Sequence, residues 1–155
     1  MVSGRLDSLV ADSQGAMGYM IQRDLREELE RRGVRASVAT ILTEVEVDPD
    51  DAAFAQPTKP IGAFYLATDA HRLQRERGWA MVEDSGRGWR RVVPSPAPRT
   101  IVPLEVIRQL VEARVTVIAC GGGGIPVSRG PDGRLRGVEA VIDKDLASAL
   151  LAEHL

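Results

Sequence analysis

The chain contains two lysines, and each lies in a segment suited to contact with a negatively charged group. Lys59 lies in the proline-bounded segment PTKPIG, and Lys144 lies between two aspartates in VIDKDL. Of the 20 lysines and arginines in the chain, all except these two are arginine. A lysine ammonium is a compact, mobile point charge, whereas a guanidinium is a planar fork. The two lysines are therefore candidates for holding a mobile positive charge against an anion.

The segment VIDKDL, residues 141–146, predicts a strand that leads into the N-terminus of a helix capped by Asp143. The helix dipole and free backbone N–H groups favour an anion there, and Lys144 adds a full charge. Asp145 is placed to hold that ammonium or a second lysine. Such a pair suits phosphoryl transfer, which depends on positioning and charge neutralisation. The alternative is a capping aspartate beside a solvated lysine.

Four consecutive glycines follow a predicted buried strand in the segment CGGGGIPV, residues 120–127. Open α/β sheets bind ligands at the carboxyl ends of their strands, where Gly121, Gly122, Gly123 and Gly124 would lie. Glycines let backbone N–H groups approach an anion closely, so this loop is a candidate phosphate cradle. The segment matches no named nucleotide-binding loop, and the alternatives are a tight turn or a flexible linker.

Further charged or reactive residues carry weaker predictions. Lys59 between prolines has a restricted backbone, although a surface lysine is the alternative. Arg87, Arg90 and Arg91 in GRGWRRVVPSP predict either an anion-binding edge or a charged strand edge that prevents aggregation. Cys120 shares no evident motif with either histidine, so we expect a buried structural thiol.

The composition predicts one soluble domain with a sizeable core and excludes several partner classes. The chain has 155 residues, 44% of them apolar, and a net charge of −2. This charge gives no electrostatic footprint for nucleic acid or an anionic membrane. One cysteine and two histidines argue against a zinc site, and we expect no metal ligands. No signal peptide or membrane span is evident, which favours a cytoplasmic protein.

The hydrophobic pattern places these motifs on alternating helices and strands. We predict helices at 12–32, 68–78 and 103–114 and from Lys144 onward, with strands at 37–47, 114–120 and 137–143. Gly33 is placed to end the first helix, and residues 128–137 predict a hairpin or loop. Residues 61–100 read as a β-rich insertion or flap. This order favours an α/β fold with a largely parallel sheet between helices.

Taken together, five segments resemble carbamate kinases. They are SQGAMGY (13–19), VDPDDAAFAQPTKPIG (47–62), EDSGRGWRRVVPSPAP (83–98), ACGGGGIPV (119–127) and GVEAVIDKDLAS (137–148). The resemblance implies the three-layer α/β/α amino-acid-kinase fold, present in part, over residues 1–155. Residues 48–98 would form its protruding, β-rich subdomain. It also implies a homodimer.

The resemblance further implies reversible phosphoryl transfer between ATP and carbamate, giving ADP and carbamoyl phosphate, with Mg²⁺ at the phosphates. Lys59 and Lys144 would face the transferred group, and Asp145 would organise them as the third catalytic residue. The four glycines would line the substrate and phosphate site.

The resemblance leaves out two segments of the family, the N-terminal GGN loop and the C-terminal nucleotide-binding segment. We therefore expect the 155-residue chain to be inactive alone. One alternative is a non-catalytic remnant that binds anions or pairs with a full-length subunit. Another is an amino-acid kinase that acts on a carboxylate or phosphonate, which the segments PTKPIG and GRGWRRVVPSP argue against.

Overall fold

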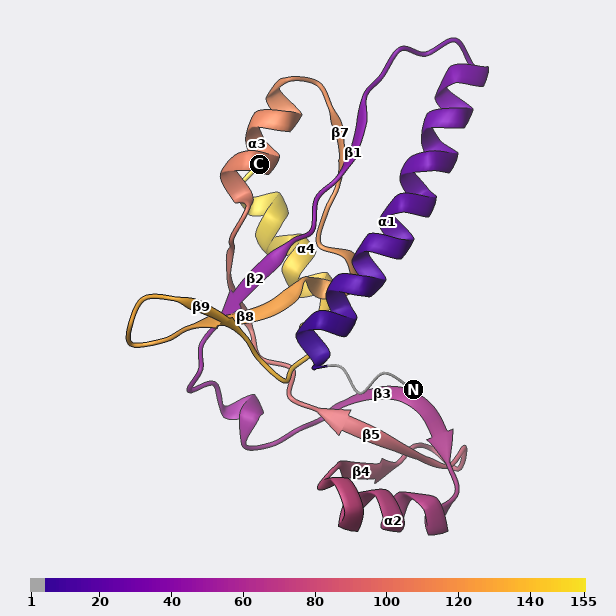
Figure 1. Cartoon of the computed structure of the whole chain (residues 1–155), viewed down its shortest axis with the longest axis vertical. Helices are drawn as coiled ribbons and strands as arrows, with labels where there is room; N and C mark the ends of the chain where they lie inside the picture. The colour runs from indigo at the N-terminus through magenta and orange to yellow at the C-terminus, as the bar shows by residue number, and fades with distance from the viewer. Residues whose placement is uncertain (1–4) are drawn as a thin grey trace.

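The structure is a computed structural model that describes residues 5–155 (Figure 1). Its α-helices are α1 (Leu6–Arg31), α2 (Ala67–Arg77), α3 (Leu104–Glu112) and α4 (Lys144–Glu153). Short 3-10 helices occur at η1 (Ala52–Phe54) and η2 (Gly121–Gly123). The strands are β1 (Val38–Thr40), β2 (Glu44–Val47), β3 (Lys59–Tyr65), β4 (Ala80–Glu83), β5 (Trp89–Val93), β6 (Pro98–Ile101), β7 (Thr116–Ile118), β8 (Ile125–Arg129) and β9 (Leu135–Gly137).

The strands of residues 5–155 form three sheets. The first pairs β1 with β7, the second has the order β6-β2-β8-β9, and the third has the order β3-β5-β4. The β1–β7 and β2–β8 pairs are parallel, and the other four pairings are antiparallel. The prediction of a largely parallel sheet was therefore wrong, because antiparallel strands flank the parallel β2–β8 pair on both sides. The α/β fold class is confirmed.

Helices cover the parallel strands on both sides. Figure 1 shows α1 on one side of the β1–β7 pair and α3 on the other. The buried core gathers around β2 and the inner faces of α3 and α4, and consists of Val45, Val47, Ile101, Ile107, Cys120, Ile142 and Ala147. The three-layer α/β/α arrangement implied by the resemblance is present.

The predicted strand at 37–47 is split between two sheets. Val38–Thr40 pairs with β7, whereas Glu44–Val47 pairs with β6 and β8. The strand is interrupted at residues 41–43, where the Thr43 backbone N–H donates to the Gln14 side chain instead of to a neighbouring strand. The Thr43 carbonyl accepts from Ile125 N. The many β-branched residues of this segment thus predicted the strand but did not reveal the break.

The segment predicted as a strand at 137–143 is mostly irregular. Only its first residue, Gly137, lies in a strand, as the end of β9. The backbone N–H groups beyond it go to different partners, Val138 to Pro126 O and Val141 to Pro94 O. No single neighbouring strand can therefore form a ladder with this segment. A hairpin or loop was predicted at residues 128–137, and this segment does form the larger part of the hairpin that joins β8 and β9.

The third sheet and α2 form a separate unit at the lower end of the molecule (Figure 1). This unit runs from Lys59 to Val93, inside the range 48–98 expected for a protruding subdomain. Strand β3 was not predicted, because Pro60 and Gly62 argue against a strand. Both are tolerated because β3 is an edge strand whose pairing shifts between Ile61 and Tyr65. The division into domains stays a prediction, and residues 1–4 of its range lie outside the described residues.

The predicted helices are present, with small changes at their ends. Helix α1 begins at Leu6, six residues before the predicted start, and Gly33 follows it with a positive φ of 69°. Helix α4 begins at Lys144 with Asp143 as its cap, as predicted. The long N-terminal helix and the capped C-terminal helix both contact η2, and so frame the glycine loop.

Candidate functional site

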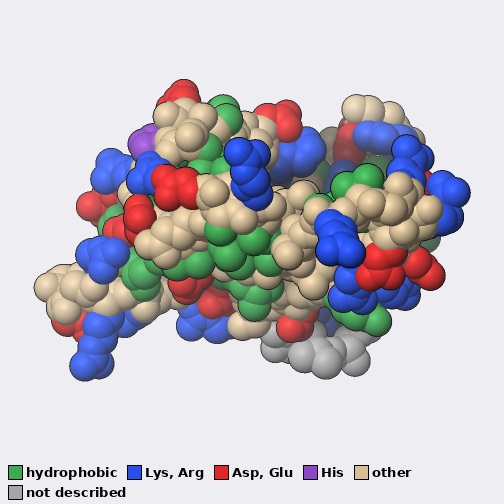
Figure 2. Space-filling view, turned by 90° about the horizontal axis from the view of Figure 1, so that it is seen from above, with side chains coloured by type: hydrophobic (Ala, Val, Ile, Leu, Met, Phe, Trp, Pro, Cys, Tyr) green, Lys and Arg blue, Asp and Glu red, His purple; other side chains and the backbone are tan. Residues whose placement is uncertain are grey.

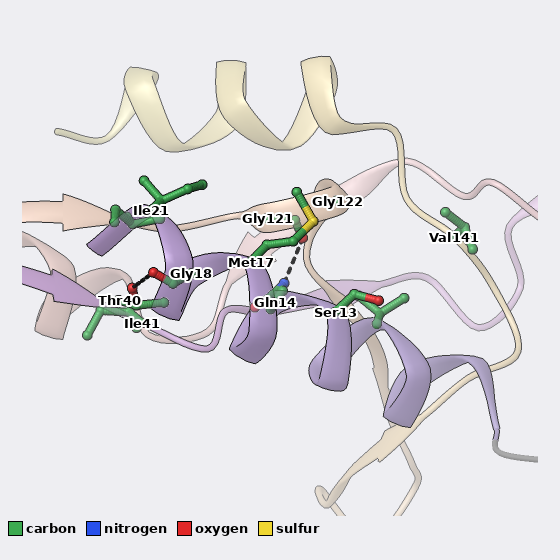
Figure 3. Close-up of a pocket in the computed structure, with 12 residues that line it drawn as sticks. Ser13, Gln14, Met17, Gly18, Ile21, Thr40, Ile41, Gly121, Gly122 and Val141 are labelled. Carbon is green, nitrogen blue, oxygen red and sulfur yellow. Dashed lines mark hydrogen bonds between the residues drawn. The ribbon is translucent and has the colours of Figure 1, made fainter. Parts of the chain in front are cut away.

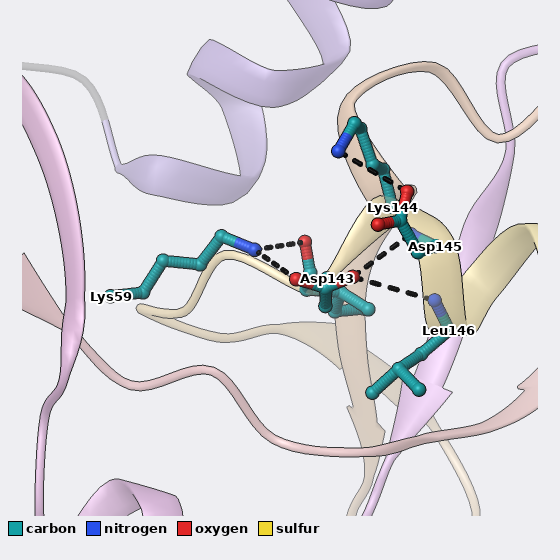
Figure 4. A network of polar contacts seen from close by, with 6 residues as sticks. Lys59, Asp143, Lys144, Asp145 and Leu146 are labelled. Carbon is teal, nitrogen blue, oxygen red and sulfur yellow. Dashed lines mark hydrogen bonds and ion pairs between the residues drawn. The ribbon is translucent and has the colours of Figure 1, made fainter.

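Lys59 lies at the start of β3 and reaches across to the segment that precedes α4. Its ammonium Nζ lies 3.0 Å from Asp143 Oδ2 and 3.5 Å from the carbonyl oxygen of Ile142 (Figure 4). The Lys59 side chain thus contacts two residues that lie 83 and 84 positions further along the sequence. The Lys59 side chain is 27% exposed and so is only partly covered by its neighbours.

Asp143 has a second task besides holding Lys59. Its other oxygen, Oδ1, accepts hydrogen bonds from the backbone N–H groups of Asp145 at 2.9 Å and Leu146 at 3.4 Å. This is the side-chain cap that a helix N-terminus favours. The Lys59 ammonium, followed by the Asp145 N–H, holds the pKa of Asp143 below its ordinary value. The carboxylate therefore stays ionised between two sets of donors.

Lys144 and Asp145 occupy the first turn of α4 and form their own ion pair. Lys144 Nζ lies 3.2 Å from Asp145 Oδ1, and the two side chains are 71% and 82% exposed. A pair this exposed adds little stability, so the ammonium is free to leave it. Lys59 pairs instead with Asp143, and the role of Asp145 in organising both lysines stays a prediction. Sequence reasoning treated Asp143 only as a cap and missed this ion pair.

The glycine loop, residues 121–124, adopts backbone conformations that other residues avoid. Gly122, Gly123 and Gly124 have φ values of 66°, 102° and 94°. A Cβ atom on Gly123 would lie 2.3 Å from the Ile142 carbonyl oxygen, and one on Gly124 would lie 2.2 Å from Val45 Cγ2. Gly123 and Gly124 are therefore packed into place, whereas a Cβ atom on Gly122 would meet nothing within 4 Å. The loop lies directly against the segment that carries Asp143.

A buried polar network supports the glycine loop from the side of α1. Gln14, only 5% exposed, donates from Nε2 to the Gly121 carbonyl at 2.9 Å, and its Oε1 accepts from Thr43 N at 2.9 Å. Thr43 Oγ1 in turn accepts from Cys120 N at 3.0 Å. Gln14 was not among the predicted site residues, although it lies in the SQGAMGY motif. A glutamine on the inner face of an amphipathic helix was the available signal.

A cavity of about 270 Å³ lies between α1 and the glycine loop (Figure 3). It is lined by Gly121 and Gly122 and mainly by apolar side chains, including Met17, Ile21 and Ile118. Met17 and Ile21 are also 62% and 48% exposed. The cavity therefore offers apolar surface, whereas the charged groups lie at the other end of the loop with Asp143.

The three arginines of the GRGWRR segment are occupied by carboxylates and aromatic rings. Arg87 and Arg90 lie 2.8 and 3.5 Å from Asp84, whose pKa the Arg87 guanidinium lowers. Arg91 lies 3.6 Å from Glu139 and over the Trp79 ring. Arg91 thus ties the protruding sheet to the segment before Asp143, which sequence reasoning did not anticipate.

Cys120 and the two histidines, His71 and His154, make contacts typical of side chains with a structural role. Burial raises the pKa of the Cys120 thiol, and the residue has a positive φ of 55°. This setting is that of a structural thiol. His71 packs edge-on against Trp89, and the His154 ring Nδ1 lies 2.9 Å from Leu150 O.

Residues 5–155 bring no three His, Cys, Asp or Glu side chains together as a metal cluster. In the same part of the chain, no helix is both long and apolar enough to cross a membrane. Figure 2 shows basic and acidic side chains interspersed over the face seen from above.

Comparison with known proteins gives matches along almost the whole chain. Carbamate kinases of Pyrococcus furiosus and Clostridium perfringens are 57% and 53% identical to it, over 97% and 96% of its length. These matches cover only 48% and 47% of those proteins, so the chain spans about half the length of the relatives it matches. No family model matches the sequence.

Solved structures give the same result. A carbamate kinase from Giardia lamblia bound to AMP-PNP matches with a TM-score of 0.87 and 43% identity, over 99% of this chain and 48% of that one. A crystal structure of a protein from Aeropyrum pernix matches with a TM-score of 0.92 and 42% identity, over 98% of this chain and 49% of that one.

Proposed function

Because the chain belongs to the carbamate kinase family, we propose that its two lysines and glycine loop form the phosphoryl-binding part of a carbamate kinase site. The reaction is reversible phosphoryl transfer between ATP and carbamate, which gives ADP and carbamoyl phosphate. The observation that carries the proposal is the meeting of three distant segments. The Lys59 ammonium lies 3.0 Å from Asp143 Oδ2, and Gly123 packs against the backbone of Ile142 and Asp143.

Each of these groups has a role that suits a transferred phosphoryl group. The ammonium groups of Lys59 and Lys144 neutralise negative charge that develops on its oxygens. The N-terminus of α4 adds backbone N–H donors and the positive end of a helix dipole. Asp145 pairs with Lys144 at 3.2 Å and holds its ammonium at the start of α4 for contact with the phosphoryl group. Gly121, Gly122, Gly123 and Gly124 line the substrate and phosphate site.

The proposed nucleotide is ATP or ADP with Mg²⁺. A Giardia relative with the same fold is described as bound to AMP-PNP, which supports nucleotide binding. The two lysines and the glycine loop fit phosphate groups, since their chemistry is that of anion binding. Magnesium bound to the phosphates supplies further neutralisation of their charge. We also propose that the protein forms a homodimer and acts in the cytoplasm. The family resemblance supports both parts of this proposal.

A second candidate function is a non-catalytic chain that binds anions or pairs with a full-length subunit. Exposed apolar residues on α1 favour this alternative, because Met17, Met20 and Ile21 are 62%, 54% and 48% exposed. Such a group of apolar side chains beside an apolar cavity is typical of a surface that another polypeptide covers. The two functions share the anion site but differ in whether transfer occurs.

The experiment measures ATP formation from ADP, Mg²⁺ and carbamoyl phosphate by two proteins. One is the 155-residue chain, and the other is a chimera in which this chain replaces the matched half of the Pyrococcus furiosus enzyme. We expect ATP from the chimera and none from the chain alone. Acetyl phosphate as the donor tests the choice of substrate and should give far less ATP. A folded chimera that makes no ATP would favour the non-catalytic alternative.

A further inference from the structure

The two lysines of the site are held by two different aspartates. Lys59 pairs with Asp143 at 3.0 Å, and Lys144 pairs with Asp145 at 3.2 Å. The sequence Asp143-Lys144-Asp145 therefore does not act as one carboxylate that gathers both ammonium groups. One pair crosses from β3 to the start of α4, whereas the other lies entirely within the first turn of α4 (Figure 4).

The two pairs differ in how firmly they are held. The side chains of the Lys59–Asp143 pair are 27% and 42% exposed, compared with 71% and 82% in the Lys144–Asp145 pair. Asp143 is fixed from its other oxygen by the N–H groups of Asp145 and Leu146. Lys59 also donates to the Ile142 carbonyl at 3.5 Å. The position of Lys59 is thus tied to the helix cap.

The same short segment sets the position of the glycine loop. A Cβ atom on Gly123 would lie 2.3 Å from the Ile142 carbonyl oxygen and 3.3 Å from the Asp143 carbonyl carbon. One residue, Asp143, therefore joins three parts of the site through its side chain and backbone. These parts are the ammonium from β3, the N-terminus of α4 and the glycine loop.

We propose that Asp143 is a positioning residue that fixes the Lys59 ammonium against the N-terminus of α4, while Asp145 holds only Lys144. The inference rests on the proposed function for what the ammonium does there. It concerns a residue that the family resemblance did not assign to the site. Capping of α4 uses only Asp143 Oδ1. It does not account for the contact between Oδ2 and the Lys59 ammonium.

The test uses the fact that the chain has only two lysines. Lysine labelled with ¹³C and ¹⁵N gives one ε-methylene signal for Lys59 and one for Lys144 in the 155-residue chain. Asp143→Asn keeps a cap oxygen but removes the charge. We expect Asp143→Asn to shift the Lys59 signal to that of a solvated lysine and leave Lys144 in place. Asp145→Asn should shift only Lys144.

Two further variants keep this test informative. Asp143→Ser also keeps a capping oxygen and serves if Asp143→Asn fails to fold. Asp69→Asn is the matched control, since Asp69 is 46% exposed, lies in the first turn of α2 and pairs with Arg72 at 3.0 Å. It should move neither lysine signal. An Asp143 variant that folds and leaves Lys59 in place, or an Asp145 variant that moves both lysines, would overturn the proposal.

Titration with inorganic phosphate then separates positioning from simple charge. Removing a negative charge beside an anion site should tighten phosphate binding, whereas loss of a placed ammonium should weaken it by about tenfold. We expect Asp143→Asn to weaken binding and abolish the response of Lys59, with Lys144 still responding. Tighter binding with both lysines responding would overturn the proposal. If neither lysine responds in the unmodified chain, the proposed function fails, and the Asp143 pairing is still decided by the lysine signals.

Discussion

The glycine loop and the charged groups beside it are built in opposite ways. Gly123 and Gly124 have positive φ and leave no space for a Cβ atom, and the loop rests on the buried Gln14 side chain. By contrast, the charged cluster, defined as Lys59, Asp143, Lys144 and Asp145, is partly to largely exposed. Its order comes from ion pairs and one helix cap.

This difference separates two requirements of anion chemistry. Backbone donors act best when they are fixed before the ligand arrives, because no reorganisation is then needed. Ammonium groups act best when they can follow a charge that moves during transfer. We therefore expect substitutions in the glycine loop to change stability, and substitutions in the charged cluster to change chemistry with little loss of stability.

The largest effect on stability should come from Gly123→Ala. Its Cβ atom would lie 2.3 Å from the Ile142 carbonyl oxygen in a backbone with φ of 102°. Overpacking and an unfavourable φ together should lower the free energy of unfolding by about 3 kcal/mol. Urea unfolding measures the loss. Gly122→Ala is the control, because φ is 66° but nothing lies within 4 Å, and it should lose about 1 kcal/mol. Equal losses would contradict a packed loop.

The next largest loss should come from Gln14→Ala. This change removes the side-chain partner of the buried Thr43 N–H and of the part-buried Gly121 carbonyl. Unsatisfied buried groups should lower the free energy of unfolding by about 2 kcal/mol. Gln109→Ala on the exposed face of α3 is the comparison and should change it by less than about 0.5 kcal/mol. If Gln14→Ala behaves like Gln109→Ala, the network does not support the loop.

A smaller effect should appear as pH dependence at Asp143. Its pKa is lower in the folded chain than its ordinary value of 3.8, first because of Lys59 and then because of the Asp145 N–H. Its stabilising contribution is therefore complete well above pH 3.8 and disappears as the pH falls through the folded pKa. Urea unfolding across pH should show Asp143→Asn less stable than the parent chain at neutral pH, with the gap closing in acid. A gap independent of pH would indicate a role other than charge.

The smallest effect on stability should come from Lys144→Ala. Its side chain is 71% exposed and its partner Asp145 is 82% exposed. The free energy of unfolding should change by less than about 0.5 kcal/mol, since exposed ion pairs contribute little. Thermal and urea unfolding both report it. A loss of unfolding free energy comparable with that of Gln14→Ala would mean that Lys144 supports the structure of the loop.

Sequence reasoning found the parts of the site that depend on local patterns. Asp143 as a cap, Lys144 at the start of α4 and four glycines after β7 are all local features, and all are present. The helices were found for the same reason, because an amphipathic period of 3.6 residues is visible in one segment.

The missed features depend on contacts between distant segments. Lys59 and Asp143 are 84 positions apart, and Gln14 and Gly121 are 107 apart, so no local pattern links them. The break in the strand at Thr43 has the same origin, because a side chain from α1 takes the place of a strand partner. Strand β3 was missed because Pro60 is tolerated only at a sheet edge, which the sequence does not reveal.

The most direct measurement of the central claim is the rate of ATP formation by the chimera with and without Lys144→Ala. The assay supplies ADP, Mg²⁺ and carbamoyl phosphate, and subtracts spontaneous breakdown of the donor. We predict that Lys144→Ala slows transfer by at least about a hundredfold, which corresponds to about 2.7 kcal/mol of transition-state stabilisation, while the fold is unchanged. A loss of less than about threefold would contradict a role for this ammonium at the transferred phosphoryl group.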